Sequence, residues 1–203
     1  PAPPSDTSVW TEIGEGLQVL REVPSVRGAM LHLVLLYSLL AALYVLALQL
    51  AALIDNLGAS GFGALLAMSG LGMAIGAVVI AQVGHRFSRR RLTAAGLGTI
   101  TFTLVVLTQV QGSLGFTLAV CGILGVGAAL VAIPAQTTIQ EETPETERGR
   151  VFGLQNNLIN IALSLPLVLA GTLVSSIGLQ PVLWLLAGLA LTAALLERPW
   201  ERC

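Results

Sequence analysis

Long apolar stretches alternate with short polar ones along most of the sequence. An α-helix needs roughly 20 predominantly apolar residues to cross a bilayer, and most of the stretches reach that length. Because lipid cannot hydrogen-bond backbone N–H and C=O groups, a segment in the bilayer must satisfy them itself, so we expect every stretch to be helical. The pattern predicts six membrane spans, over residues 28–54, 61–84, 92–111, 113–136, 151–176 and 181–196.

The residues before the first span follow a different pattern. Residues 1–9 are rich in Pro and Ser and are expected to be disordered. Apolar residues at helical spacing within residues 10–22 predict a short amphipathic helix at the membrane surface that ends before Pro24. The start reads like a linker, so we expect the chain to be the back part of a longer protein. We divide it into a linker with the surface helix (residues 1–27), a six-helix membrane domain (residues 28–196) and a tail (residues 197–203).

The composition is that of a membrane protein. Hydrophobic residues make up 55% of the chain and charged residues 10%, whereas a soluble domain carries about 25% charged residues. The chain therefore needs the lipid bilayer around it. A net charge of −1 gives no reason to expect a nucleic-acid partner. The histidines and cysteines, His32, His85, Cys121 and Cys203, lack the spacing of a metal site, and we expect no cofactor.

The arginines lie between the predicted spans rather than within them. Two connections, one between the second and third spans and one between the fourth and fifth, hold Arg86, Arg89, Arg90, Arg91, Arg148 and Arg150. The remaining arginines lie towards the two ends of the chain, and the other three connections have none. With six spans, every arginine falls on one side of the membrane. Because short arginine-rich loops stay in the cytosol, we expect both termini to be cytoplasmic.

Small residues recur at three- and four-residue spacing in the second and fourth spans. They are Ser69, Gly72, Gly76, Gly122, Gly125 and Gly127. Small side chains allow helix backbones to approach closely, which is the interpretation we favour. Helices that slide or rock also need small contacts, so the pattern is compatible with transport.

No arrangement of residues favours an enzyme. The sequence has no nucleophile–base pair, no carboxylates paired within a span and no glycine-rich phosphate loop. The central part of every span also lacks Asp, Glu, Lys and Arg, so a carboxylate that couples transport to protons would have to belong to another part of the protein. Asp55 and His32, near the two ends of the first span, are best explained as solvated or interfacial residues.

One face of the fifth span is polar. Amides pressed against lipid are costly, so this face is expected to meet protein or water. Lining a cavity and bonding to a neighbouring helix fit equally well. On the first span two tyrosines share a face, which suits either an aromatic ligand or ordinary packing. The candidate substrate-binding residues are Tyr37, Tyr44, Gln136, Asn156, Asn157, Asn160 and Ser164.

Acidic residues after the fourth span share the arginine side. Glu141, Glu142, Glu145 and Glu147 could pair with the arginines of the second connection and form a gate, or they could simply be solvated. Exposed pairs contribute only about 0–1 kcal/mol each. The candidate gate residues are Arg86, Arg89, Arg90, Arg91, Glu141, Glu142, Arg148 and Arg150.

Three stretches resemble the major facilitator superfamily. Residues 81–90 resemble its Gly-x-x-x-Asp-Arg-x-Gly-Arg-Arg loop, with Arg86, Arg89 and Arg90 at the basic positions, but His85 stands where the acidic residue belongs. Residues 133–154 are similar to the junction of the fourth and fifth helices in drug and siderophore exporters. Residues 15–24 are similar to the surface helix that links the two halves of such proteins.

The resemblance implies an all-α membrane protein, namely six transmembrane helices arranged as two inverted three-helix repeats. It implies the C-terminal half of an exporter in the bacterial inner membrane. The partners would be the missing N-terminal six-helix half and a small amphipathic substrate. Two alternatives remain open at this point. One is a six-helix scaffold that binds a partner protein without transport, and the other is a half-transporter that works as a dimer.

Overall fold

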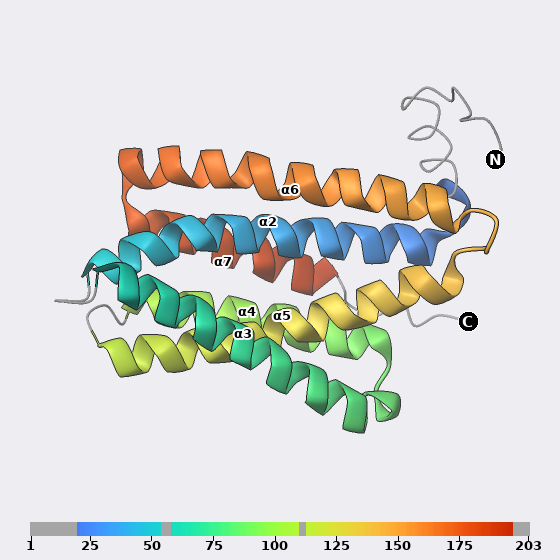
Figure 1. The fold of residues 1–203 in the computed structure, drawn as a ribbon, viewed down its shortest axis with the longest axis horizontal. Helices are drawn as coiled ribbons and strands as arrows, with labels where there is room; N and C mark the ends of the chain where they lie inside the picture. Colours follow the sequence, from blue (N-terminus) through green and yellow to red (C-terminus); the bar gives the residue numbers. More distant parts are fainter. Residues whose placement is uncertain (1–19, 54–57, 110–112, 197–203) are drawn as a thin grey trace, which may run out of the picture.

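The computed structural model describes residues 20–53, 58–109 and 113–196, and helices account for nearly all of them (Figure 1). Six of these helices are long and apolar enough to cross a membrane, which confirms the predicted spans and the all-α fold. The surface helix over residues 10–22, apart from its last residues, and Asp55, Arg198 and Arg202 lie outside the described residues. The helices are α2 (Pro24–Leu53), α3 (Gly58–Val83), α4 (Arg89–Gln109), α5 (Leu114–Glu142), α6 (Arg148–Ile177) and α7 (Leu179–Leu196), with a short 3-10 turn η1 (Gly84–Arg86) before α4.

Several helices extend beyond the apolar stretches that predicted them. The helical residues 20–22 end before Val23, so the surface helix stops ahead of Pro24 as expected, and Pro24 itself begins α2, where a residue without a backbone N–H is well tolerated. Helix α5 continues to Glu142 and α6 begins at Arg148, in polar sequence on both sides of a short connection. Hydropathy marks only the part of a helix that meets lipid, whereas backbone hydrogen bonding continues past it.

The six helices alternate in direction, and helices from the first half of the chain pack against helices from the second half (Figure 1). Helices α2 and α5 pack against each other at the centre; α3 packs mainly on α5, and α6 mainly on α2. Helix α4 packs on α5 and α7. If α2–α4 and α5–α7 are taken as two repeats, each second helix lies against the first helix of the other repeat. A repeat of three spans reverses the direction of the next one, so the arrangement is that of two inverted repeats.

The main apolar core lies between α2, α4, α5 and α7. Its fully buried side chains include Leu36, Leu46, Leu97, Leu104 and Leu183. In a bilayer the helices gain little from hydrophobic transfer when they associate, so close van der Waals packing must hold them together. Helices α3 and α6 bury the least of their surface and leave broad faces directed away from the core.

Glycines allow α3 to lie directly against α5. A Cβ atom at Gly72 would overlap the backbone carbonyl of Gly122, and one at Gly125 would overlap that of Ser69. The Ser69 hydroxyl donates a hydrogen bond to the Cys121 carbonyl at 3.2 Å across the same contact. The interpretation of these small residues as packing residues is therefore correct for this pair of helices.

Glycines also allow α4 to lie close to α5. A Cβ atom at Gly96 would lie 2.7 Å from the carbonyl oxygen of Gly127. Gly127 belongs to the predicted set of small residues, but its partner Gly96 does not. Helix α5 thus presents small residues to two neighbours, which explains why it is the most buried of the six helices.

Candidate functional site

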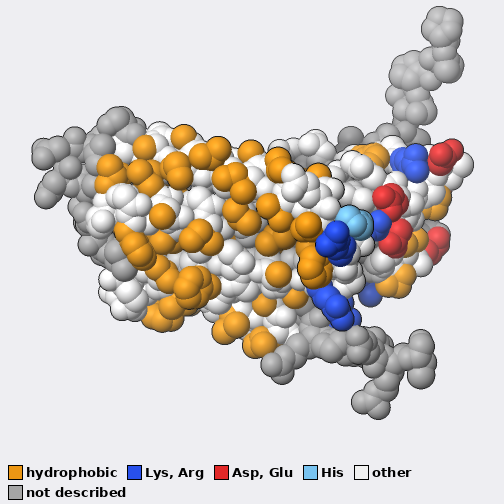
Figure 2. All heavy atoms as spheres, turned by 90° about the horizontal axis from the view of Figure 1, so that it is seen from below, with side chains coloured by type: hydrophobic (Ala, Val, Ile, Leu, Met, Phe, Trp, Pro, Cys, Tyr) orange, Lys and Arg blue, Asp and Glu red, His pale blue; other side chains and the backbone are white. Residues whose placement is uncertain are grey.

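The charged side chains of the described residues gather at one end of the bundle (Figure 2). We call this the arginine end; the start of α2, the turn between α3 and α4, the connection between α5 and α6, and the end of α7 meet there. Among the described residues, the opposite end carries no Asp, Glu, Lys or Arg. The described arginines therefore all lie at one end of the bundle, as expected from their positions between the predicted spans, and this end is strongly polar.

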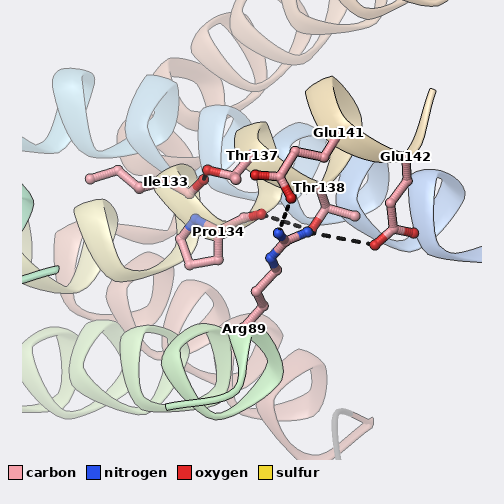
Figure 3. Close-up of polar contacts among 7 residues, drawn as sticks. All are labelled: Arg89, Ile133, Pro134, Thr137, Thr138, Glu141 and Glu142. Atoms are coloured by element: carbon pink, nitrogen blue, oxygen red, sulfur yellow. Dashed lines mark hydrogen bonds and ion pairs between the residues drawn. The ribbon is translucent and has the colours of Figure 1, made fainter. Parts of the chain in front are cut away.

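Arg89 joins α4 to α5 at the arginine end (Figure 3). Its guanidinium contacts the Glu141 carboxylate, lies 3.5 Å from the Glu142 carboxylate and donates a hydrogen bond to the Thr138 hydroxyl at 3.3 Å. The three partners are spaced three and four residues apart, so they form one face of α5. Thr138 in turn donates to the carbonyl of Pro134 at 2.9 Å. One arginine therefore holds the last two turns of α5.

Helix polarity explains why this pairing is favourable. Arg89 is the first residue of α4, where the positive end of the helix dipole disfavours a cation, and the two glutamates end α5, where the negative end disfavours anions. Bringing them together offsets both penalties. The side chains of Arg89 and Glu141 are 41% and 59% exposed, so solvent screens the pairs. Each pair then contributes about 0–1 kcal/mol, as surface ion pairs do.

The other two glutamates do not reach the turn between α3 and α4. Glu145 pairs with Arg148 at 3.7 Å, and Glu147 pairs with Arg150 at 3.1 Å. Both pairs are three residues apart in sequence, at the start of α6, and a local partner costs less chain ordering than a distant one. Of the four predicted glutamates, Glu141 and Glu142 thus pair with Arg89 of α4, whereas Glu145 and Glu147 pair locally with arginines at the start of α6.

The three asparagines of α6 are exposed, and they point away from the bundle's core. The buried residues of α6, which include Val151, Leu154 and Ala162, lie on its other side, towards α2. Within the described part of the chain, none of the three asparagine side chains forms a hydrogen bond. Among the described residues, the hydrogen bond recorded on this face is local, from the Ser164 hydroxyl to the backbone carbonyl of Asn160 at 2.8 Å. Bonding to a neighbouring helix of this chain therefore does not account for the polar face.

The two tyrosines of α2 have different surroundings. Tyr37 is half-buried against the apolar cluster at the arginine end. Tyr44 is 44% exposed, and its ring lies edge-on to that of Phe62 on α3, with 5.1 Å between ring centroids. No hydrogen bond or ring contact joins either tyrosine to the asparagines of α6 in the described residues. The two sets of candidate residues thus lie on neighbouring helices that pack together, with no hydrogen bond between them in the described residues.

Gln136 has a partner that the sequence pattern did not single out. The side-chain amide of Gln155 on α6 donates to the side-chain oxygen of Gln136 on α5 at 2.8 Å. Gln155 is buried, and its own side-chain oxygen has no partner among the described residues. Asn156 and Gln155 are adjacent but about 100° apart around the helix, so one faces inward and the other outward. The detectable feature was a glutamine inside an apolar span, which requires a partner.

The fold and this polar end can be compared with known families. The family model of the Major Facilitator Superfamily matches residues 30–200, which is most of the chain. The chain belongs to the Major Facilitator Superfamily. Members of this superfamily are membrane transporters, and the chain is accordingly an integral membrane protein built for transport. The superfamily match covers all six helices almost completely, so the fold and the sequence agree on one assignment.

Proposed function

We propose that this chain forms the C-terminal half of an exporter that moves small amphipathic molecules by alternating access. In this proposal the exposed face of α6 lines the path between the chain and a second six-helix half. The observation that carries it is the row of Asn156, Asn157 and Asn160, exposed and without side-chain hydrogen bonds in the described residues. A buried amide without a partner costs about 1–3 kcal/mol by protein mutational data, so water or a polar partner is the favoured neighbour.

The depth of these residues suits a cavity. Helix α6 has 30 residues and is about 45 Å long, so it exceeds a hydrocarbon core of about 30 Å by roughly 15 Å. Asn156 and Asn160 lie about 12 Å and 18 Å from the start of the helix at 1.5 Å per residue. Both fall within the bilayer in the half nearer the arginine end. An amide there would offer hydrogen bonds to the polar part of an amphipathic substrate.

The proposal also includes the orientation of the chain in the membrane and the direction of transport. The arginine end is placed in the cytosol because translocation of short arginine-rich loops is disfavoured, and the bacterial inner membrane follows from the resemblance to exporters. The similarity of residues 133–154 to drug and siderophore exporters supports export rather than uptake. The Arg89 contacts lie at the cytosolic mouth of the path, where they would hold α4 and α5 together as the halves rock.

Replacing Asn160 with leucine in the full-length protein tests the cavity role. A lost hydrogen bond to substrate corresponds to roughly 0.5–1.5 kcal/mol, so KM for a substrate rich in hydrogen-bonding groups should rise roughly three- to tenfold. Transport of an apolar dye should change far less, and the melting temperature should stay near that of the parent. Purified protein in liposomes gives both rates, and thermal unfolding gives the stability.

A matched control is Thr172→Val. Thr172 is also exposed on α6, but its hydroxyl donates to backbone carbonyls of its own helix, Leu169 among them at 2.9 Å. This variant should transport both substrates normally. Equal loss for both substrates in Asn160→Leu, together with a lowered melting temperature, would assign Asn160 to packing and remove the support for a lined path.

A further inference from the structure

The turn between α3 and α4 combines positive charge with an exposed aromatic ring. Residues 84–91 include four arginines and one histidine, and the sequence has no Asp or Glu from residue 56 to residue 140. Arg86, Phe87 and Arg91 are exposed, and the exposed fraction of Phe87 is 50%. The turn is thus a cationic surface that contains no carboxylate of its own.

Two arginines of this turn are available to a partner outside the chain. In the described part of the chain, the guanidinium groups of Arg86 and Arg91 form no ion pair and no hydrogen bond. The carboxylates that approach the start of α4, Glu141 and Glu142, are both engaged by Arg89. Neighbouring cations repel one another, so an anion from outside the chain would offset a repulsion that the chain itself leaves in place.

Local hydrogen bonds fix the shape of the turn. The Ser88 hydroxyl accepts a hydrogen bond from the Arg91 N–H at 3.3 Å, which caps the start of α4. The Phe87 N–H donates to the Gly84 carbonyl at 3.1 Å. The backbone that carries Arg86, Phe87 and Arg91 is therefore ordered before any partner binds, and binding need not order it.

The length of α4 places this turn at the membrane surface. Helix α4 has 21 residues and is about 32 Å long, which barely exceeds a hydrocarbon core of about 30 Å. The connection between α5 and α6 reaches farther along the long axis of the bundle than the turn does (Figure 1). Figure 2 shows arginines at the border of the apolar surface, with the acidic side chains farther towards the tip. The turn therefore lies at head-group level, and the glutamates of the next connection lie beyond it.

We propose that the turn between α3 and α4 docks on the anionic phospholipids of its own leaflet, with Arg86 and Arg91 on head-group phosphates and Phe87 among the upper acyl chains. Charge complementarity supports this partner, since anionic lipids attract basic residues that lie close to the surface. Phe87 adds an apolar contact that continues the exposed apolar face of α3, which includes Val78 and Val79. The proposal needs the chain to lie in a bilayer, but it does not depend on the substrate or the direction of transport.

Lipid binding by the purified full-length protein tests the charge part of the proposal. Native mass spectrometry would measure binding of phosphatidylglycerol, with phosphatidylcholine as the zwitterionic comparison. Arg86→Gln/Arg91→Gln should bind phosphatidylglycerol roughly 25-fold more weakly, since each basic residue near an anionic surface contributes about a factor of five. The control Arg148→Gln/Arg150→Gln removes the same charge at the same end, but from arginines that pair with glutamates of their own connection, and it should retain binding.

A spin label tests the depth of the turn. Single cysteines replacing Phe87 or Thr146, in a background without Cys121 and Cys203, would be labelled in liposomes that contain phosphatidylglycerol. Thr146 is exposed in the connection between α5 and α6. Because oxygen concentrates in lipid and a nickel chelate stays in water, the label at position 87 should respond mainly to oxygen and the label at position 146 mainly to the chelate.

One more variant guards against misfolding. Arg86→Lys/Arg91→Lys keeps both charges, so it should bind phosphatidylglycerol nearly as well as the parent does. Equal loss of lipid in the two glutamine double variants would overturn the proposal, as would equal binding of phosphatidylcholine and phosphatidylglycerol by the parent. A label at position 87 that responds mainly to the chelate would place the turn in water and would also overturn it.

Discussion

Replacing Gly125 with alanine is expected to separate α3 from α5 and to leave little correctly folded protein. The added Cβ atom would overlap the backbone carbonyl of Ser69, and a backbone cannot move aside as a flexible side chain can. Overpacking against side chains typically costs 1–3 kcal/mol, so we expect a loss at or above about 3 kcal/mol here. Melting temperature and the yield of monodisperse protein in mild detergent measure the effect.

Glycines elsewhere on the same two helices provide the controls. A Cβ atom at Gly115 on α5 or at Gly70 on α3 would meet nothing within 4 Å. Alanine at either position should leave stability unchanged or raise it slightly, because alanine has the higher helix propensity. Gly72→Ala should behave like Gly125→Ala, since it meets the Gly122 carbonyl from the other helix. If Gly125→Ala were as stable as Gly115→Ala, the two helices could not be in backbone contact.

Reversing the charge of Arg89 is expected to be the most damaging change at the arginine end. Arg89→Glu would place a third carboxylate beside Glu141 and Glu142 and would remove the hydrogen bond to Thr138. Loss of the attraction and new repulsion together amount to roughly 2 kcal/mol for partly exposed groups, so transport should fall by on the order of tenfold at matched expression. Uptake into inside-out vesicles containing the full-length protein measures it.

The swap Arg89→Glu/Glu141→Arg is the decisive companion to this variant. It restores one ion pair between α4 and α5 with the charges exchanged, and it should recover part of the lost transport. Arg21→Glu changes the net charge equally at the same end but lies outside both candidate sites, so it should remain close to the parent. Transport by Arg89→Lys should lie between that of the parent and that of Arg89→Glu. Lysine keeps the positive charge but lacks the planar guanidinium that can reach several acceptors at once. A swap that transports no better than Arg89→Glu alone would show that the pairing itself is not required.

The number of helices and their order could be read from the sequence, because hydropathy and arginine placement constrain a membrane protein strongly. Their ends could not be read in the same way, as the continuation of α5 to Glu142 shows, since a helix need not stop where lipid stops. The small residues of α3 and α5 were recognisable by spacing, but their pairing, Gly72 with Gly122 and Gly125 with Ser69, depends on how the helices cross.

The candidate site shows the same limits. The sequence indicated that carboxylates and arginines share one end, but it did not indicate that Arg89 would contact Glu141 and Glu142 while Glu145 paired locally. Contacts across 50 or so residues depend on packing that no local pattern encodes. The asparagines of α6 were recognisable as a face, whereas Gln155, one position earlier, was missed because its role depends on Gln136 of another helix.

The central claim is that the asparagine face of α6 borders water inside the bilayer, and cysteine accessibility in the full-length protein measures it directly. Single cysteines at Asn157, Asn160 and Leu165 would be introduced into a background without Cys121 and Cys203 and probed in membranes with a water-soluble thiol reagent. All three positions are exposed, but Leu165 lies on a different side of the helix from the asparagines. We expect rapid labelling at Asn157 and Asn160 and none at Leu165. Protection of both asparagine positions, or labelling of all three at the same rate, would contradict the account.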